Sequence, residues 1–289
     1  MPASQVITLN QNTKISHYLT QTCLALILGF IAFNLQAAEA FNNQSCNSLI
    51  KDKQLNQICH LAIKGDAKAR YTMAKFFADP RNNFPKKMDY AYFWHLNLAR
   101  QIIKEKLTEP AYADILYNTG VLYTDGLGTP ADSKKGLYWF KQAAERGHSL
   151  AMTRLFLAYE NAQGTKKDTQ KAQKWLQKAV QLKNPEAQIL MAQQLMQGSA
   201  APKDIQKGLS FLKEAAQEDS AKANYILGKY YLMAPEMQNP PHLTEAKQYF
   251  GNSCKLHFLI GCKRYYDLDN PSQTLPTKPN KSNQTIDFK

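Results

Sequence analysis

The chain has 289 residues, and 36 Lys and Arg against 23 Asp and Glu give it a formal net charge of +13. Hydrophobic residues make up 44% and charged residues 20%, which excludes a chain that is disordered throughout. The 13 Gly and 13 Pro are too few for a collagen-like or linker-dominated chain. The length predicts one large domain or two ordinary ones.

The first forty residues are typical of a secretory signal peptide. Residues 23–35 are almost wholly apolar, and the segment before them carries Lys14 and no acidic residue. Ala38-Glu39-Ala40 then offers a small-x-small cleavage site before Phe41. The apolar run is shorter than the ~17–25 residues that a spanning helix needs, so a membrane anchor is the less favoured alternative. We therefore expect a mature chain of 41–289 that is periplasmic or secreted and does not span a membrane.

Four cysteines belong to this mature chain, namely Cys46, Cys59, Cys254 and Cys262. An even count in an exported protein predicts two disulfides, for which three pairings are possible. We favour the local pairs Cys46–Cys59 and Cys254–Cys262. Through the entropy of the loop that it closes, each bond would stabilise the folded chain by roughly 2.5–3 kcal/mol. Four buried thiols are the alternative. The sequence lacks the closely spaced Cys pairs and paired His of a zinc site, so no metal is expected.

The middle of the chain repeats with a period of 36 residues. Trp139, Trp175 and Phe211 follow one another at this interval. The same interval separates Tyr123, Tyr159, Leu195 and Tyr231, the aspartates Asp132, Asp168 and Asp204, and the lysines Lys135, Lys171 and Lys207. A fixed period of this length predicts a stacked array of small structural units.

Each period has the pattern of two helices joined by a turn. Ala151, Leu155 and Tyr159 recur at helical spacing, and a turn rich in Gly, Asp or Pro follows such a first helix. The repeated aspartates then stand where a second helix would begin, where a carboxylate can cap free N–H groups. The tryptophans Trp94, Trp139 and Trp175 share one position of the second helix, so we expect them in the core rather than at a ligand.

Weaker copies flank the regular ones. A copy begins near Ala69 and has a longer second helix at about 87–106, whereas the last copy has two extra residues near 235–241. A closing helix is predicted at 256–266. The predicted organisation is a signal peptide at 1–40, an N-terminal capping segment at 41–65, a solenoid with its closing helix at 66–266 and a disordered tail at 267–289.

One stretch resembles a known family. Thr119-Gly120-x-x-Tyr123-x-x-Gly126-x-Gly128, followed by Asp132, Lys135, Trp139-Phe140, Ala143-Ala144 and Gly147, is similar to the Sel-one-like repeats (SLRs), relatives of the tetratricopeptide repeat. The resemblance covers about 66–262 and implies an all-α, right-handed α/α superhelix of about five helix-turn-helix repeats with end-capping helices. It also implies a protein-interaction scaffold. Ala162 departs from the pattern, because it replaces the first turn glycine.

The resemblance further implies where a partner would bind. The exposed side of each first helix lines the concave face of such solenoids. Equivalent positions there carry three tyrosines and two lysines, namely Tyr71, Tyr117, Tyr225, Lys75 and Lys229. Tyrosine combines a broad contact face with a hydrogen-bonding tip, so these residues predict a groove for a peptide or polymer. The alternative is that the rings pack against neighbouring helices.

The sequence offers little sign of catalysis or of a cofactor. Cysteine-rich SLR proteins have been linked to penicillin binding and β-lactam hydrolysis, so the resemblance permits that activity. Two Ser-x-x-Lys strings occur, at Ser48–Lys51 and Ser210–Lys213, but the partner motifs Ser-Asp-Asn and Lys-Thr-Gly do not. We therefore favour a non-enzymatic scaffold with no cofactor, and keep a β-lactam-reactive protein as the alternative.

The positive charge bears on the class of partner. A basic exported protein favours anionic partners, such as an acidic protein or peptidoglycan. Nucleic acid fits the sign of the charge but not the compartment. A basic face that only keeps the protein in solution is the alternative, because many lysines are predicted on outer helix faces.

Overall fold

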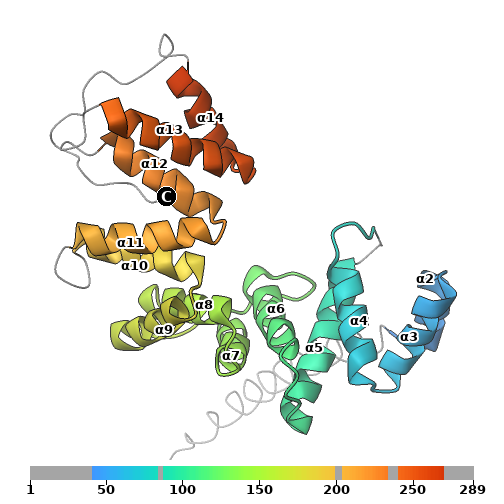
Figure 1. Ribbon diagram of the computed structural model, residues 1–289. Coiled ribbons are helices and arrows are strands. Elements are labelled where there is room, and N and C mark those ends of the chain that lie inside the picture. Colours follow the sequence, from blue (N-terminus) through green and yellow to red (C-terminus); the bar gives the residue numbers. More distant parts are fainter. Residues whose placement is uncertain (1–40, 84–86, 199–203, 234–239, 270–289) are drawn as a thin grey trace, which may run out of the picture. The chain divides into compact units, whose positions relative to one another are not determined.

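The computed structural model describes residues 41–83, 87–198, 204–233 and 240–269 (Figure 1). The predicted signal peptide and all but the first three residues of the predicted tail lie outside these ranges. The chain divides into two compact units, which meet in sequence between Asp132 and Ser133, and each is described by itself. All thirteen regular elements of the described residues are α-helices, so the predicted all-α fold is confirmed.

The first unit contains five described helices: α2 (Asn43–Leu49), α3 (Lys53–Ile63), α4 (Ala67–Ala78), α5 (Lys87–Glu105) and α6 (Tyr112–Asp125). The second unit contains eight: α7 (Ser133–Ala144), α8 (Ser149–Glu160), α9 (Thr169–Gln181), α10 (Pro185–Gln197), α11 (Ile205–Gln217), α12 (Ala221–Met233), α13 (Pro240–Lys255) and α14 (Leu259–Asp269). The last helix reaches three residues beyond the predicted end at 266.

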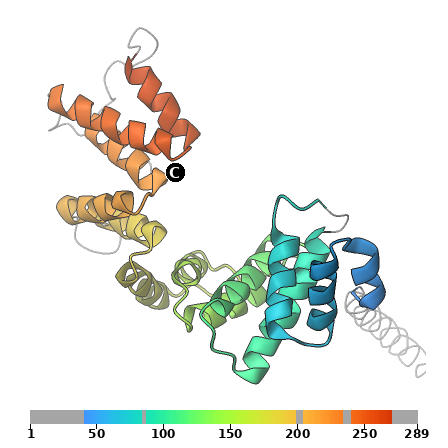
Figure 2. The same ribbon diagram turned by 45° about the vertical axis from the view of Figure 1, so that its right-hand side comes forward.

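Within each unit, helices that follow one another in sequence pack against each other. The pairs α4–α5, α8–α9, α10–α11 and α12–α13 lie side by side in both views (Figures 1 and 2). Each pair is one helix-turn-helix repeat, and its second helix also packs on the helix that follows. This order of contacts is that of an α-solenoid, as the repeat period predicts.

Polar side chains cap the N-terminal ends of the helices at repeating positions. Asp66, His148, Asn184 and Ser220 accept hydrogen bonds from the backbone N–H three residues later, at the starts of α4, α8, α10 and α12. The predicted caps Asp168 and Asp204 do the same for α9 and α11, each at 2.9 Å. These bonds satisfy N–H groups that have no partner inside the helix, so they fix where each repeat begins.

The turn inside each repeat explains its two glycine positions. Gly126 and Gly198 end α6 and α10 in the left-handed backbone region, and Ala162 takes the same conformation with a φ of 56°. The second position is also constrained by space, because a Cβ on Gly164 would clash with the backbone carbonyl of Ser133. A Cβ on Gly128 would likewise clash with the carbonyl of Met88. The turn thus packs closely against the start of the preceding second helix.

The expected core role of the tryptophans needs one correction. Trp94 and Trp139 are buried, with exposed fractions of 1% and 7%, but Trp175 is partly exposed. The buried stripe of α9 consists of Ala172, Leu176 and Ala179, and Trp175 lies on the flank of that stripe. In α9 the fully buried large side chain is therefore Leu176, which follows the repeated aromatic position at Trp175.

An aromatic cluster closes the core of the first unit around Phe41. The Phe41 ring is 5% exposed, and its centroid lies 5.2 Å from that of Trp94 and 5.4 Å from that of Phe77. Tyr90 and Phe93 complete the surroundings, at 5.0 Å and 6.0 Å. These side chains come from α4, α5 and the segment before α2, so Phe41 connects the start of the described chain to the core.

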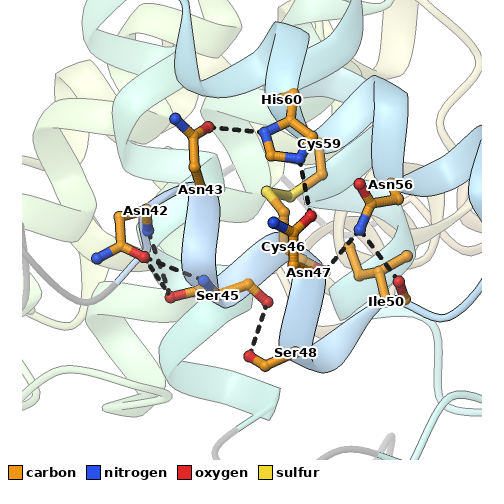
Figure 3. The surroundings of a disulfide bond; sticks show 10 residues. All are labelled: Asn42, Asn43, Ser45, Cys46, Asn47, Ser48, Ile50, Asn56, Cys59 and His60. Atoms are coloured by element: carbon orange, nitrogen blue, oxygen red, sulfur yellow. Dashed lines mark hydrogen bonds between the residues drawn. A yellow bond between two sulfur atoms is a disulfide. The ribbon is translucent and has the colours of Figure 1, made fainter.

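Helix α2 is linked to α3 by a disulfide bond (Figure 3). Asn42 caps α2 in a reciprocal arrangement with Ser45. Cys46 and Cys59, both fully buried, are bonded across the two helices with their Cα atoms 5.9 Å apart. The Asn56 side-chain amide donates hydrogen bonds to the carbonyls of Cys46 and Ile50, which closes the turn between the helices.

The other two cysteines join the last two described helices. Cys254 in α13 is bonded to Cys262 in α14, with Cα atoms 4.3 Å apart. Both favoured local pairings are therefore present.

Candidate partner-binding surface

Two of the predicted tyrosines form matching pairs with the predicted lysines. On α4 the Lys75 ammonium lies 5.5 Å from the centroid of the Tyr71 ring. On α12 the Lys229 ammonium lies 5.7 Å from the centroid of the Tyr225 ring. A spacing of four residues places such side chains one above the other on a helix, and a cation over a ring is attracted by its negative face. We call these two pairs the Tyr–Lys pairs.

Both tyrosines are partly exposed and also packed. The Tyr71 ring lies 6.3 Å from Tyr112 of α6, and the Tyr225 ring lies 5.8 Å from Phe250 and 5.4 Å from Phe258. The two interpretations of these rings are thus compatible, because neighbours orient each ring while part of it faces solvent. A ring held by such neighbours would lose little rotamer entropy if a partner covered it.

The predicted site residues divide between the two units. Tyr71, Lys75 and the partly exposed Tyr117 belong to the first unit, and Tyr225 and Lys229 belong to the second. Phenol hydroxyls and ammonium groups can bind carboxylates and peptide carbonyls, but they do not form a nucleophile with its base.

Neither Ser-x-x-Lys string forms an evident catalytic pair. The Ser48 hydroxyl donates a hydrogen bond to the Ser45 carbonyl, and the Ser210 hydroxyl donates one to the Lys207 carbonyl, at 3.2 Å and 2.8 Å. Both are ordinary bonds from a helical serine to the preceding turn. In the described part of the chain, no three His, Cys, Asp or Glu side chains gather as metal ligands would.

A hollow on α9 was missed by sequence reasoning. It is lined by Lys171, Lys174, Trp175, Gln177, Lys178 and Gln181. The sequence carries a signal for it, because residues 169–181 contain three lysines and no acidic residue. That signal was obscured by the assignment of Trp175 to the core.

Comparison with known proteins identifies this architecture. The repeated helix pairs define an α-solenoid of the kind that presents binding surfaces. The Sel1 repeat family model matches three consecutive segments, 113–148, 149–184 and 185–220, which contain α6–α7, α8–α9 and α10–α11. The chain therefore contains three Sel1 repeats, and the predicted resemblance to this repeat family is confirmed. Sel1 repeats generally serve as protein-interaction scaffolds rather than enzymes.

Solved structures show the same fold at low sequence identity. A Sel1 repeat protein from Oxalobacter formigenes is 20% identical, with a TM-score of 0.58 over 77% of this chain and 88% of that chain. A protective antigen of uropathogenic Escherichia coli with an SLR fold is 17% identical, with a TM-score of 0.56 over 83% of this chain. The match covers 52% of that antigen, about half of its length. No curated protein sequence matches the chain closely.

Of the helices that the described ranges contain, none combines the length and the apolar character needed to span a bilayer.

Proposed function

We propose that this chain is an exported SLR scaffold that binds protein or peptide partners through the exposed side of its first helices. The observation that carries the proposal is the recurrence of the same Tyr–Lys pair in two distant repeats, at Tyr71–Lys75 and Tyr225–Lys229. A packing role alone calls for the ring, not for a lysine four residues later. The repeated pair offers an oriented aromatic face beside a positive charge, which suits a partner with acidic side chains.

Export has its own support. Two disulfides persist in oxidising compartments, and the disulfides here join the first two and the last two described helices. The candidate cleavage site ends at Ala40, directly before the buried Phe41. N-terminal sequencing of the protein recovered from the periplasm or the medium tests this part, and the expected first residue is Phe41. An intact N-terminus in a membrane fraction would favour the anchor instead.

The binding part is tested by charge reversal, because it leaves the rings packed. We expect Lys75→Glu with Lys229→Glu to lose partners that the mature protein captures from an envelope extract. A second variant, Tyr71→Phe with Tyr225→Phe, keeps the rings and removes only the hydroxyls. The matched control is Lys68→Glu with Lys222→Glu, which makes the same charge change at exposed positions of the same two helices. Circular dichroism establishes that all variants are folded.

Three outcomes would contradict the proposal. Equal capture by wild type and the Lys75 and Lys229 variant would place partner binding elsewhere. Capture of peptidoglycan but of no protein would favour an envelope binder. A covalent adduct on Ser48 or Ser210 after incubation with a penicillin, seen as a shift in intact mass, would favour the β-lactam-reactive alternative.

A further inference from the structure

The second unit carries an unusual hollow on one helix. Side chains of α9 border an open surface hollow of about 380 Å³, lined by Lys171, Lys174, Trp175, Gln177, Lys178 and Gln181. None of these six side chains is acidic or aliphatic. The lining therefore combines one large aromatic ring, three cations and two amides, which is a set of groups suited to an anionic polymer.

Aromatic rings lie directly beside the cations. The Lys178 ammonium is 4.6 Å from the centroid of Trp175, whose ring is partly exposed. At the other end of the hollow, the Lys171 ammonium is 5.8 Å from the centroid of Tyr159 on α8. Both rings and all three lysines lie in one Sel1 repeat, 149–184. The negative faces of the two rings attract the ammonium groups of Lys171 and Lys178.

Two of the three lysines of α9 have no ion-pair partner among the described residues. Asp168 pairs with Lys171 at 2.9 Å, but within the described ranges Lys174 and Lys178 form no ion pair. They are four residues apart, and like charges at that spacing destabilise a helix. Neighbouring second helices avoid this arrangement: Lys141 of α7 has Glu145 four residues later, and α11 has Glu214 at the repeat position of Lys178. The unfavourable stripe is therefore particular to α9 among these three helices.

We propose that this hollow binds an extended acidic polypeptide segment with two carboxylates two residues apart. Lys174 and Lys178 are separated by about 6 Å along the helix axis, because the rise is ~1.5 Å per residue. Side chains on one side of an extended chain recur every ~6.6 Å, so alternate carboxylates meet both ammonium groups. The ring of Trp175 receives the peptide between them, and the amides of Gln177 and Gln181 can bind its backbone.

This site is separate from the Tyr–Lys pairs and does not depend on the function proposed for them. It lies on a second helix, whereas Tyr71 and Tyr225 lie on the first helices α4 and α12. The two proposals can therefore fail separately. In particular, Lys75→Glu with Lys229→Glu should leave binding at the hollow unchanged within about twofold, because neither lysine lines the hollow and salt weakens exposed charges that make no direct contact.

Tryptophan fluorescence provides a direct test. Trp94 and Trp139 are buried, so acrylamide should quench Trp175 preferentially. The probe is a blocked synthetic pentapeptide with Glu at alternate positions, and its neutral counterpart has Gln there. We expect the Glu peptide to bind saturably to the mature protein and to protect the indole from acrylamide. The Gln peptide should do neither, and the protected signal should be absent from Trp175→Phe.

Matched variants separate the site from general charge. Lys174→Gln with Lys178→Gln should weaken binding of the Glu peptide roughly tenfold, as expected for two exposed ion pairs. Lys213→Gln with Lys222→Gln removes the same charge from exposed positions of α11 and α12 and should change it less than about twofold. Equal weakening by both variants, or no saturable binding, would overturn the proposal. It would also fail if anionic vesicles or polyphosphate protected Trp175 and the Glu peptide did not.

Discussion

The ring of Phe41 packs edge-on against the ring of Trp94, with their centroids 5.2 Å apart and their planes inclined by 66°. Phe41 is the residue that would become the N-terminus after cleavage at the candidate site. The first side chain of the mature protein would then belong to its core, and Asn42 beside it caps α2. Cleavage before Phe41 keeps the packed ring and the cap of α2, whereas the loss of two further residues, Phe41 and Asn42, removes both.

We expect Phe41→Ala to lower the free energy of unfolding of the first unit by about 3–5 kcal/mol, the usual effect of truncating a buried aromatic ring. Urea unfolding of the chain that begins at Phe41 measures this. Leu61→Ala is the control, because Leu61 is 50% exposed, and it should change stability by less than ~0.5 kcal/mol. Equal effects of the two changes would show that the ring is not packed as described.

Two substitutions in the turn between α8 and α9, two residues apart, should change the free energy of unfolding in opposite directions. Ala162→Gly should raise the free energy of unfolding by about 0.5–1 kcal/mol, because Ala162 is held at a φ of 56°. Gly164→Ala should lower it by at least ~2 kcal/mol, because its Cβ would meet the backbone of Ser133 at a φ of 70°. Paired urea curves measure both changes. Destabilisation by Ala162→Gly would contradict the left-handed conformation.

Stability should decrease with acidity because of His95. Burial lowers the pKa of His95, which is 2% exposed, below its ordinary value of 6.5. The folded protein then keeps the ring neutral, whereas the unfolded chain takes up a proton as the pH falls below about 6.5. The free energy of unfolding should therefore fall by up to ~1.4 kcal/mol for each pH unit below that value. In His95→Gln this dependence should be smaller, and parallel profiles from pH 7 to pH 5 would argue against it.

The disulfide between α2 and α3 should make its own contribution. We expect Cys46→Ala with Cys59→Ala to lower the free energy of unfolding by about 3 kcal/mol, since the bond closes a loop of 13 residues. The double variant avoids a buried unpaired thiol. Non-reducing peptide mapping of the wild type should recover Cys46 linked to Cys59, and a link to Cys254 or Cys262 would refute the pairing.

The architecture could be predicted because it is repeated. The 36-residue interval between aspartates such as Asp168 and Asp204 gave both the helix pairs and their caps. Irregular parts gave no such signal. The helix α2 lies outside the repeat, and its capping box uses Ser45 where the common motif has Glu or Gln. The contact of Phe41 with α4 and α5 also joins residues far apart in sequence, which no local pattern encodes.

The surfaces were harder to predict than the fold. A repeat position shows which face a side chain occupies, but not how completely its neighbours cover it. Trp139 and Trp175 occupy the same position, yet only Trp139 is buried. For Tyr225 the sequence predicted an exposed position but not the contacts with Phe250 and Phe258 that orient its ring. Partner binding at Tyr71, Tyr117 and Tyr225 stays a prediction.

The connections between repeats differ in length from the connections within repeats. In the second unit the connections that follow second helices are short: α9 ends at Gln181 and α10 begins at Pro185, and α11 ends at Gln217 before Ala221. The connections within repeats are longer, and the two extra residues of the last repeat fall in one of them. In the second unit, we therefore expect added segments to be accommodated better within repeats than between them. An epitope inserted between Gln197 and Ile205 should be accommodated, and one placed after Lys183 should separate two repeats.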